Sequence, residues 1–140
     1  REFDLRAVRV PAEPGTIMTR LLSPWLALMR SRLRRSGVAC NDHIFGLSHS
    51  GAMDEARLLR ILAALPPGVS EIYLHPATVS GAAIAASMQG YRHREELGAL
   101  LSPAVRAALS DGAIQRGGYA DIAAFRAGRQ RAGRQRGATG

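Results

Sequence analysis

Histidine and cysteine are the side chains that most often bind metals or transfer protons near neutral pH. This sequence of 140 residues has a single cysteine, Cys40, and four histidines: His43, His49, His75 and His93. No two histidines are four residues apart, as on one face of a metal-binding helix, and there is neither an H-x-H nor a C-x-x-C pair. The spacing therefore does not define a complete metal site.

His75 has the position best suited to acid–base chemistry. The alternation in the segment 70–75 predicts a strand in which Glu71, Tyr73 and His75 share one face, opposite Ile72 and Leu74. His75 lies at the carboxyl end of this strand, where α/β folds place their active sites. An imidazole there could act as general acid or base. A structural histidine beside the following proline is an equally good interpretation.

A second polar group is formed by Asn41, Asp42 and His43, near an expected strand end. Neighbouring residues of a strand point to opposite faces, so Asp42 and His43 do not form a ready-made dyad. Turn hydrogen bonds made by Asn41 and Asp42 are the favoured interpretation. His49 has a weaker claim to function, and His93 is expected on the surface at the start of a helix.

Alternating strands and helices must position these residues. Apolar alternation predicts strands, and apolar residues at i, i+3, i+4 and i+7 predict helices. The expected strands cover about 5–10, 38–45, 70–75 and 113–116. The expected helices cover about 18–36, 53–65, 93–101, 103–110 and 119–127, and 77–90 is expected to be loop or irregular helix. This order predicts an α/β fold, either a parallel sheet or part of a β/α barrel.

The expected helix 18–36 carries a long apolar face. The side chains of this face are Leu22, Trp25, Leu26, Met29 and Leu33. Covering a sheet is the favoured interpretation. The tryptophan and the arginines of this segment would also suit an anionic membrane surface, which is the alternative. Arg32 falls close to the apolar face and fits neither interpretation well.

The composition excludes several classes of protein. Apolar residues make up 46% of the chain, which is enough to bury a core. No stretch approaches the ~18 uncharged apolar residues of a membrane span, and one cysteine excludes a disulfide scaffold. The net charge is +8, and all 19 basic residues are arginine. Five of them lie at or after residue 126, and without these five the net charge would fall to +3.

The C-terminal stretch 127–140 repeats AGRQR at 127–131 and 132–136. Because this repeat has no apolar period, we expect a disordered tail. Nucleic-acid binding through the tail is the alternative function. We expect no such partner, because no recognition motif accompanies the tail and aromatics for stacking are only 5% of the chain. The chain begins with Arg1 and enters an expected strand within a few residues, which suggests a fragment.

Several motifs together carry a resemblance to a known family. They are NDHIFGL at 41–47, SGAM at 50–53, PPGVSEIYLHP at 66–76, LSPAV at 101–105 and YAD at 119–121. In this order they resemble the C-terminal half of the YdjC-like (ChbG/HpnK) carbohydrate deacetylases, and most of all the hopanoid-biosynthesis-associated HpnK branch. The resemblance runs from about residue 3 to 126.

The resemblance implies a fold and an activity. Residues 1–126 would be the C-terminal half of a distorted β/α (TIM-like) barrel with mainly parallel strands. The enzyme would remove the acetyl group from an N-acetylated sugar, in the HpnK branch an N-acetylglucosamine carried on a hopanoid lipid. His75 matches the histidine of the family's His-Pro motif and would be catalytic, as the general acid. The substrate site would be lined by Asp42, His43, Glu71 and Tyr73.

The resemblance also implies a cofactor and partners. Family members bind a divalent metal, Mg or Zn, through an aspartate and two histidines of their N-terminal half, and no position of this chain matches these ligands. We therefore expect the isolated chain to be inactive without its N-terminal half. The other expected partners are the sugar or glycolipid and, because a half-barrel exposes sheet edges, a second copy of the chain. The expected location is the cytoplasm, with peripheral membrane contact. A non-catalytic remnant is the remaining alternative.

Overall fold

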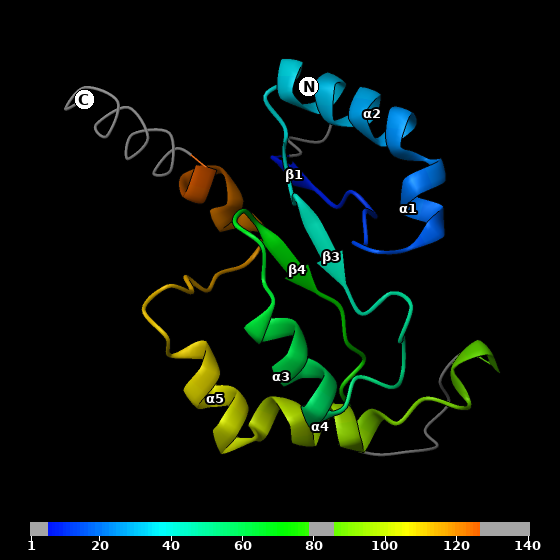
Figure 1. The fold of residues 1–140 in the computed structure, drawn as a ribbon, viewed down its shortest axis with the longest axis vertical. Coiled ribbons are helices and arrows are strands. Elements are labelled where there is room, and N and C mark those ends of the chain that lie inside the picture. Colours follow the sequence, from blue (N-terminus) through cyan, green and yellow to red (C-terminus); the bar gives the residue numbers. More distant parts are fainter. Residues whose placement is uncertain (1–5, 79–85, 127–140) are drawn as a thin grey trace.

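The computed structural model describes residues 6–78 and 86–126 (Figure 1). Its strands are β1 (Ala7–Val8), β2 (Ala39–Cys40), β3 (His43–Phe45) and β4 (Ser70–Ile72). Its α-helices are α1 (Ile17–Leu21), α2 (Ser23–Arg35), α3 (Glu55–Ala63), α4 (His93–Leu101) and α5 (Pro103–Leu109), and two 3-10 helices, η1 (Ala86–Met88) and η2 (Tyr119–Asp121), complete the described elements.

The strands form two parallel pairs, β1 with β2 and β3 with β4. Between β2 and β3, the buried Asn41 side chain accepts from the Val10 N–H and donates to the Val10 carbonyl. The Ile44 N–H also donates to the Ala12 carbonyl. The three strand segments therefore run side by side in chain order, which confirms the α/β class with parallel strands. These short strands do not form a closed barrel in the described part of the chain, so the TIM-like barrel remains a prediction.

The first helical layer differs from the single helix expected over 18–36. Two helices meet at Leu22, which is the C-cap of α1 and the N-cap of α2. Pro24 lies in the first turn of α2, where a backbone N–H would have no partner within the helix, so its absence costs little. Leu26 packs into a core with Val10, Ala12 and Cys40. The side chains of Leu22 and Trp25 are exposed, so the prediction that they cover the sheet was wrong.

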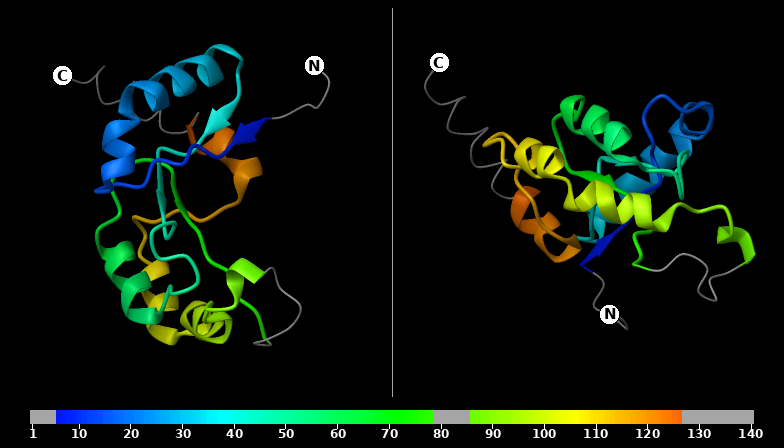
Figure 2. Two further views of the ribbon diagram at one scale, coloured as in Figure 1. Left: turned by 90° about the vertical axis from the view of Figure 1, so that its right-hand side faces the viewer. Right: turned by 90° about the horizontal axis from the view of Figure 1, so that it is seen from below.

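The second layer is built by α3, α4 and α5. Its core consists of Leu58, Leu62, Ala99 and Val105. Asp54 caps α3 by accepting from the Arg57 N–H. Ser102 caps α5 ahead of Pro103 by accepting from the N–H groups of Ala104 and Val105. Figure 2 shows α1–α3 on one side of the strands and the segment 119–126 on the other.

Several boundaries differ from the expected ones. The segment 113–116 is not a strand, because it continues a turn in which the Ile114 N–H donates to the Asp111 carbonyl. β4 ends at Ile72, earlier than expected, although the Tyr73 N–H still donates to the Phe45 carbonyl. The helix expected at 119–127 starts as η2 and continues through 126.

Some expectations fall on other parts of the chain. The tail 127–140 lies outside the described residues, as do residues 79–85 of the expected loop or irregular helix at 77–90; the described part of that segment contains η1. Within the described ranges, the helices are too short or too polar to cross a membrane.

Candidate active site

The polar face of β4 is confirmed by its contacts. The Glu71 carboxylate accepts hydrogen bonds from the guanidinium of Arg9 and from the hydroxyl of Tyr119. The Arg9 guanidinium also lies over the ring of Tyr73, 4.9 Å from its centroid. Its hydrogen bond with Glu71 raises the pKa of Arg9, while burial and the same carboxylate raise the pKa of Tyr119. These contacts hold one charged and two aromatic side chains around Glu71.

His75 continues this face beyond the end of β4. Its Nε2 lies 2.9 Å from the Tyr73 hydroxyl, and the two rings meet edge to face with centroids 4.5 Å apart. The Tyr91 ring packs on it as well, at 4.9 Å. Nδ1 of His75 is buried and has no hydrogen-bond partner among the described residues. The imidazole therefore has one oriented nitrogen and one nitrogen without a protein ligand.

The backbone of His75 is fixed by the first turns of α4. The fully buried carboxylate of Glu96 accepts from the N–H of His75 and from that of Met53. Nδ1 of His93 lies 2.6 Å from the His75 carbonyl oxygen and donates to it. His93 does start a helix, but it is 5% exposed, so the prediction of a surface residue was wrong. Burial of His93 follows from its bond to His75 and its contact with Tyr91.

The SGAM motif at 50–53 supports the same side chains. The Ser50 hydroxyl lies 2.9 Å from the Tyr91 hydroxyl, and the Gly51 carbonyl accepts from the Arg92 N–H. Gly51 has a positive φ of 78°, and a Cβ at this position would come within 2.2 Å of the Tyr91 ring. Only glycine fits this approach without displacing the ring that packs on His75.

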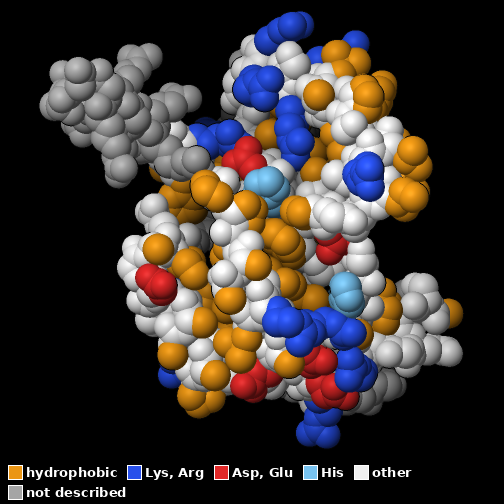
Figure 3. Space-filling model, viewed as in Figure 1, with side chains coloured by type: hydrophobic (Ala, Val, Ile, Leu, Met, Phe, Trp, Pro, Cys, Tyr) orange, Lys and Arg blue, Asp and Glu red, His pale blue; other side chains and the backbone are white. Residues whose placement is uncertain are grey.

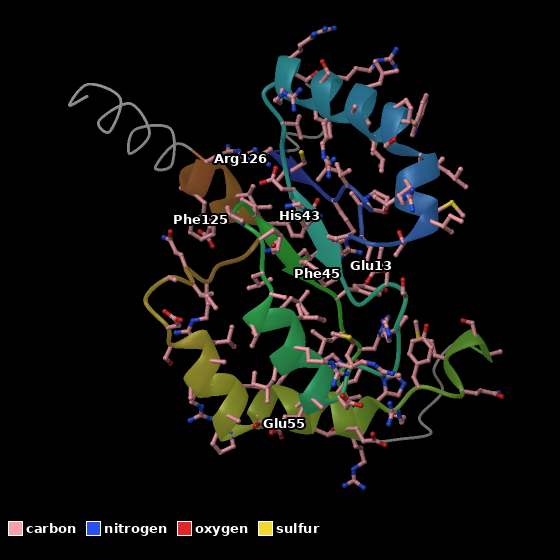
Figure 4. All side chains as sticks on the ribbon, in the orientation of Figure 1. Glu13, His43, Phe45, Glu55, Phe125 and Arg126 are labelled. Carbon is pink, nitrogen blue, oxygen red and sulfur yellow. The ribbon has the colours of Figure 1, made fainter. Side chains whose placement is uncertain are left out.

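Glu13 is a buried site residue that sequence reasoning missed. Its carboxylate accepts from the N–H groups of Gly46 and Ser48 and from the Ser48 hydroxyl. These bonds fix the loop that leaves the carboxyl end of β3, and Figure 4 shows Glu13 beside Phe45 at that end. Glu13 stands between Pro11 and Pro14 after the first strand, the only signal it gives in the sequence. Arg9 was missed as well, because its partners are more than 60 residues away.

An open pocket of about 470 Å3 lies at the amino ends of β3 and β4, opposite the end that His75 follows. Asp42 lies there because its carboxylate accepts from the Val69 N–H at 2.9 Å and from Arg126 at 2.7 Å. Burial alone would raise the pKa of Asp42, but these two donors outweigh it and lower that pKa. Arg30 donates to the Asp42 carbonyl. The pocket is lined by Arg30, Asp42, His43, Pro67, Gly68, Val69 and Arg126.

Asp42 and His43 are therefore separated from His75 along the strands. β3 begins at His43, which pairs with Ser70 at the start of β4, whereas His75 follows the far end of β4. Figure 4 shows His43 toward one end of β3 and Phe45 toward the other. Since parallel strands share their amino edge, Asp42 and His43 do not join the His75 group. Asn41 makes one bond of the expected turn type, to the His43 carbonyl, whereas its bonds to Val10 and those of Asp42 to Val69 and Arg126 reach distant segments.

The expected divalent metal does not fit the side chains described. No group of three or more His, Cys, Asp or Glu residues that could hold a metal ion occurs within 6–78 and 86–126. Glu13 and Glu96, the two buried carboxylates among the residues described, already accept hydrogen bonds from N–H and O–H groups of the protein.

Comparison with known proteins decides the family. Residues 1–111 match the family described as YdjC-like protein. The chain belongs to the YdjC-like family. The matched part includes every motif on which the resemblance was based except YAD at 119–121. Searches of curated proteins and of solved structures gave no match. Carbohydrate deacetylation is the activity associated with the YdjC-like family as a whole.

Proposed function

We propose that this chain is the C-terminal part of a carbohydrate N-deacetylase, with His75 as its general acid. The observation that carries the proposal is the half-buried imidazole of His75 at the carboxyl end of β4. Its Nε2 is oriented by the Tyr73 hydroxyl, and its Nδ1 has no partner among the residues described. Membership of the YdjC-like family supports the reaction class.

The chemistry assigned to His75 is a single proton transfer. Hydrolysis of an acetamide breaks the bond between the carbonyl carbon and the nitrogen, adds water, and yields acetate and an amine. The leaving amine needs a proton, which the imidazolium of His75 donates. The clamp on the His75 backbone by Glu96 and His93 keeps the ring in one position during this step.

The sugar is proposed to bind along the polar face of β4. Glu71 and Tyr73 stand before His75 on this face, and Glu71 is 14% exposed. The Glu71 carboxylate is already held by Arg9 and Tyr119 and the Tyr73 hydroxyl by His75 Nε2, so a ligand would meet a preorganised surface. The proposed substrate is an N-acetylglucosamine carried on a hopanoid lipid. Asp42 and His43 do not take part in the proposed binding of this substrate.

We propose that Mg or Zn is bound by residues outside this chain. The side chains described here do not supply a ligand set, so we propose that the ligands come from an N-terminal half of the same domain. The isolated 140-residue chain is then inactive. Acetate release by this chain alone, in the presence of Mg or Zn, would contradict this part of the proposal.

Acetate release by the full-length protein that contains this chain tests the activity. The substrates are an N-acetylglucosaminyl hopanoid, a soluble N-acetylglucosamine oligomer and an O-acetylated sugar as the matched control. We expect acetate together with a free amine from at least one of the first two substrates. Release from the O-acetylated sugar alone would show an esterase. Cleavage of the soluble oligomer but not of the lipid would overturn the hopanoid assignment.

A further inference from the structure

The outer face of α1 and α2 carries a row of exposed apolar side chains. Six large ones lie within twelve residues, and Ile17, Leu21 and Trp25 are 73%, 71% and 61% exposed. We call this row the outer stripe; its members are Ile17, Met18, Leu21, Leu22, Trp25 and Leu28. Apolar patches of this kind on a protein surface mark sites of interaction.

The outer stripe is distinct from the face by which α2 covers the core. Leu26 is 3% exposed and packs on the first core together with Met29 and Leu33. Trp25 and Leu28 flank Leu26 in the sequence but point away from that core. Helix α2 thus has one apolar side for its own sheet and a second apolar side with no partner among the described residues.

The charge around the outer stripe is of one sign. Between residues 14 and 41 there are five arginines and no aspartate or glutamate. Arg30 donates to the Asp42 carbonyl, while Arg20, Arg32, Arg34 and Arg35 are exposed. Figure 3 shows blue basic side chains next to the orange apolar ones along the outer edge of these two helices.

We infer that the outer stripe docks on the surface of an anionic phospholipid bilayer. The apolar side chains would enter the boundary between headgroups and acyl chains, with Trp25 at the depth that tryptophan favours. The exposed arginines would bind the lipid phosphates. A second copy of the chain fits less well, because pairing two such faces would bring eight exposed arginines together.

This inference does not depend on the proposed deacetylase, because its readout is binding to lipid. Trp25 is the only tryptophan of the chain, so intrinsic fluorescence reports on the outer stripe alone. Vesicles containing phosphatidylglycerol should shift the Trp25 emission to the blue, and vesicles of pure phosphatidylcholine should not. No shift with either would overturn the inference, and an equal shift with both would overturn the anionic assignment.

Co-sedimentation with the same vesicles tests the side chains. We expect Trp25→Ser to lower the bound fraction at least tenfold. Leu101→Ser is the matched control, since Leu101 in α4 is also 61% exposed but lies outside the outer stripe. Equal losses in the two variants would overturn the inference. Thermal melting of both variants shows whether they fold.

The arginines need a charge-matched control. Arg32→Gln with Arg35→Gln should weaken binding to the anionic vesicles by about thirtyfold, whereas Arg94→Gln with Arg106→Gln should leave it nearly unchanged. All four side chains are exposed. Identical effects of the two pairs would indicate non-specific attraction by net charge and overturn the outer-stripe assignment. A blue shift of Trp25 that grows with protein concentration without vesicles would show that a second copy covers the stripe.

Discussion

The imidazole of His75 is held from several directions, and each contact can be removed separately. Tyr73→Phe removes the hydroxyl on Nε2 but keeps the ring that packs at 4.5 Å. Without this bond the imidazole can rotate, and we expect kcat for deacetylation to fall about fivefold to tenfold with KM little changed.

Tyr91→Phe is the control for this prediction. Tyr91 also packs its ring on His75, but its hydroxyl contacts Ser50. We expect this variant to keep most of the kcat. Steady-state kinetics of the full-length protein give both values, and equal kcat values for the two variants would argue against orientation of His75 by Tyr73.

Single residues were predicted well where their role follows from a strand face. Glu71, Tyr73 and His75 share one face, as alternation indicated. Glu13 and Arg9 could not be found, because their partners are brought close only by the pairing of strands. His93 was assigned to the surface because charged residues follow it, yet its bond to the His75 carbonyl buries it.

At the scale of elements, the loop 50–53 and the start of α4 form one support for His75. Gly51→Ala forces a Cβ against the Tyr91 ring at a positive φ. We expect it to lower the free energy of unfolding by about 2 kcal/mol. Gly90→Ala is the control, because a Cβ at Gly90 would meet no atom within 4 Å. Urea denaturation of both variants measures the difference, and similar stabilities would show that Tyr91 moves aside without cost.

The turn before β3 is tied by Asp42 to Arg126 and to the Val69 N–H. The folded protein lowers the pKa of this carboxyl below its ordinary 3.8. The ionised group therefore stabilises the fold above about pH 4, and this contribution is lost as the pH falls through the lowered pKa. Asp42→Asn should lower the free energy of unfolding at pH 7 by only about 1 kcal/mol, because the ion pair of Asp42 with Arg126 is partly exposed to solvent.

The difference between Asp42→Asn and the native chain should shrink between pH 7 and pH 3, because below about pH 4 the carboxyl of the unfolded chain binds a proton and the contribution of the ionised group begins to be lost. Urea denaturation at the two pH values checks this. Asp111→Asn serves as the control, since Asp111 lies in an exposed turn and its carboxylate accepts from the nearby Ala113 N–H. A destabilisation by Asp42→Asn that is independent of pH would mean that the loss of shape, and not of charge, causes it.

The positions of the helices were predicted more accurately than which of their side chains face the core. The clear period of 53–65 and the Ser102 cap gave α3 and α5 within two residues. The segment 18–36 contains two apolar sides, and periodicity alone cannot tell which of them meets the sheet. The hydrogen bonds of the buried Asn41 side chain break the expected strand 38–45 into β2 and β3. This break decides that Asp42 and His43 lie at the start of a strand.

The described part of the chain has two apolar cores, one for each helical layer. The fully buried Asn41 binds Val10 of the first core, and β3 pairs with β4, whose Ile72 packs on the second core. We therefore expect one cooperative unfolding transition. Leu58 is only 2% exposed, so Leu58→Ala would leave a cavity in the second core. We expect this variant to lower the free energy of unfolding by about 2–4 kcal/mol.

Leu101→Ala should cost less than about 0.5 kcal/mol, because Leu101 is 61% exposed. Denaturant curves followed by circular dichroism and by Trp25 fluorescence measure both variants. Trp25 lies on α2, the helix that contributes Leu26 to the first core, and Leu58 lies in the second core, so coincident curves indicate a single unit. Separate transitions for the two probes would show that the layers unfold independently.

The central claim is that deacetylation occurs at the carboxyl edge of the strands, with His75 as general acid. The most direct measurement compares kcat of His75→Asn and His43→Asn in the full-length protein. We expect His75→Asn to lower kcat by about 100-fold or more at an unchanged melting temperature. His43→Asn, at the opposite edge, should retain nearly full activity. Full activity of His75→Asn, or an equal loss in His43→Asn, would contradict this account.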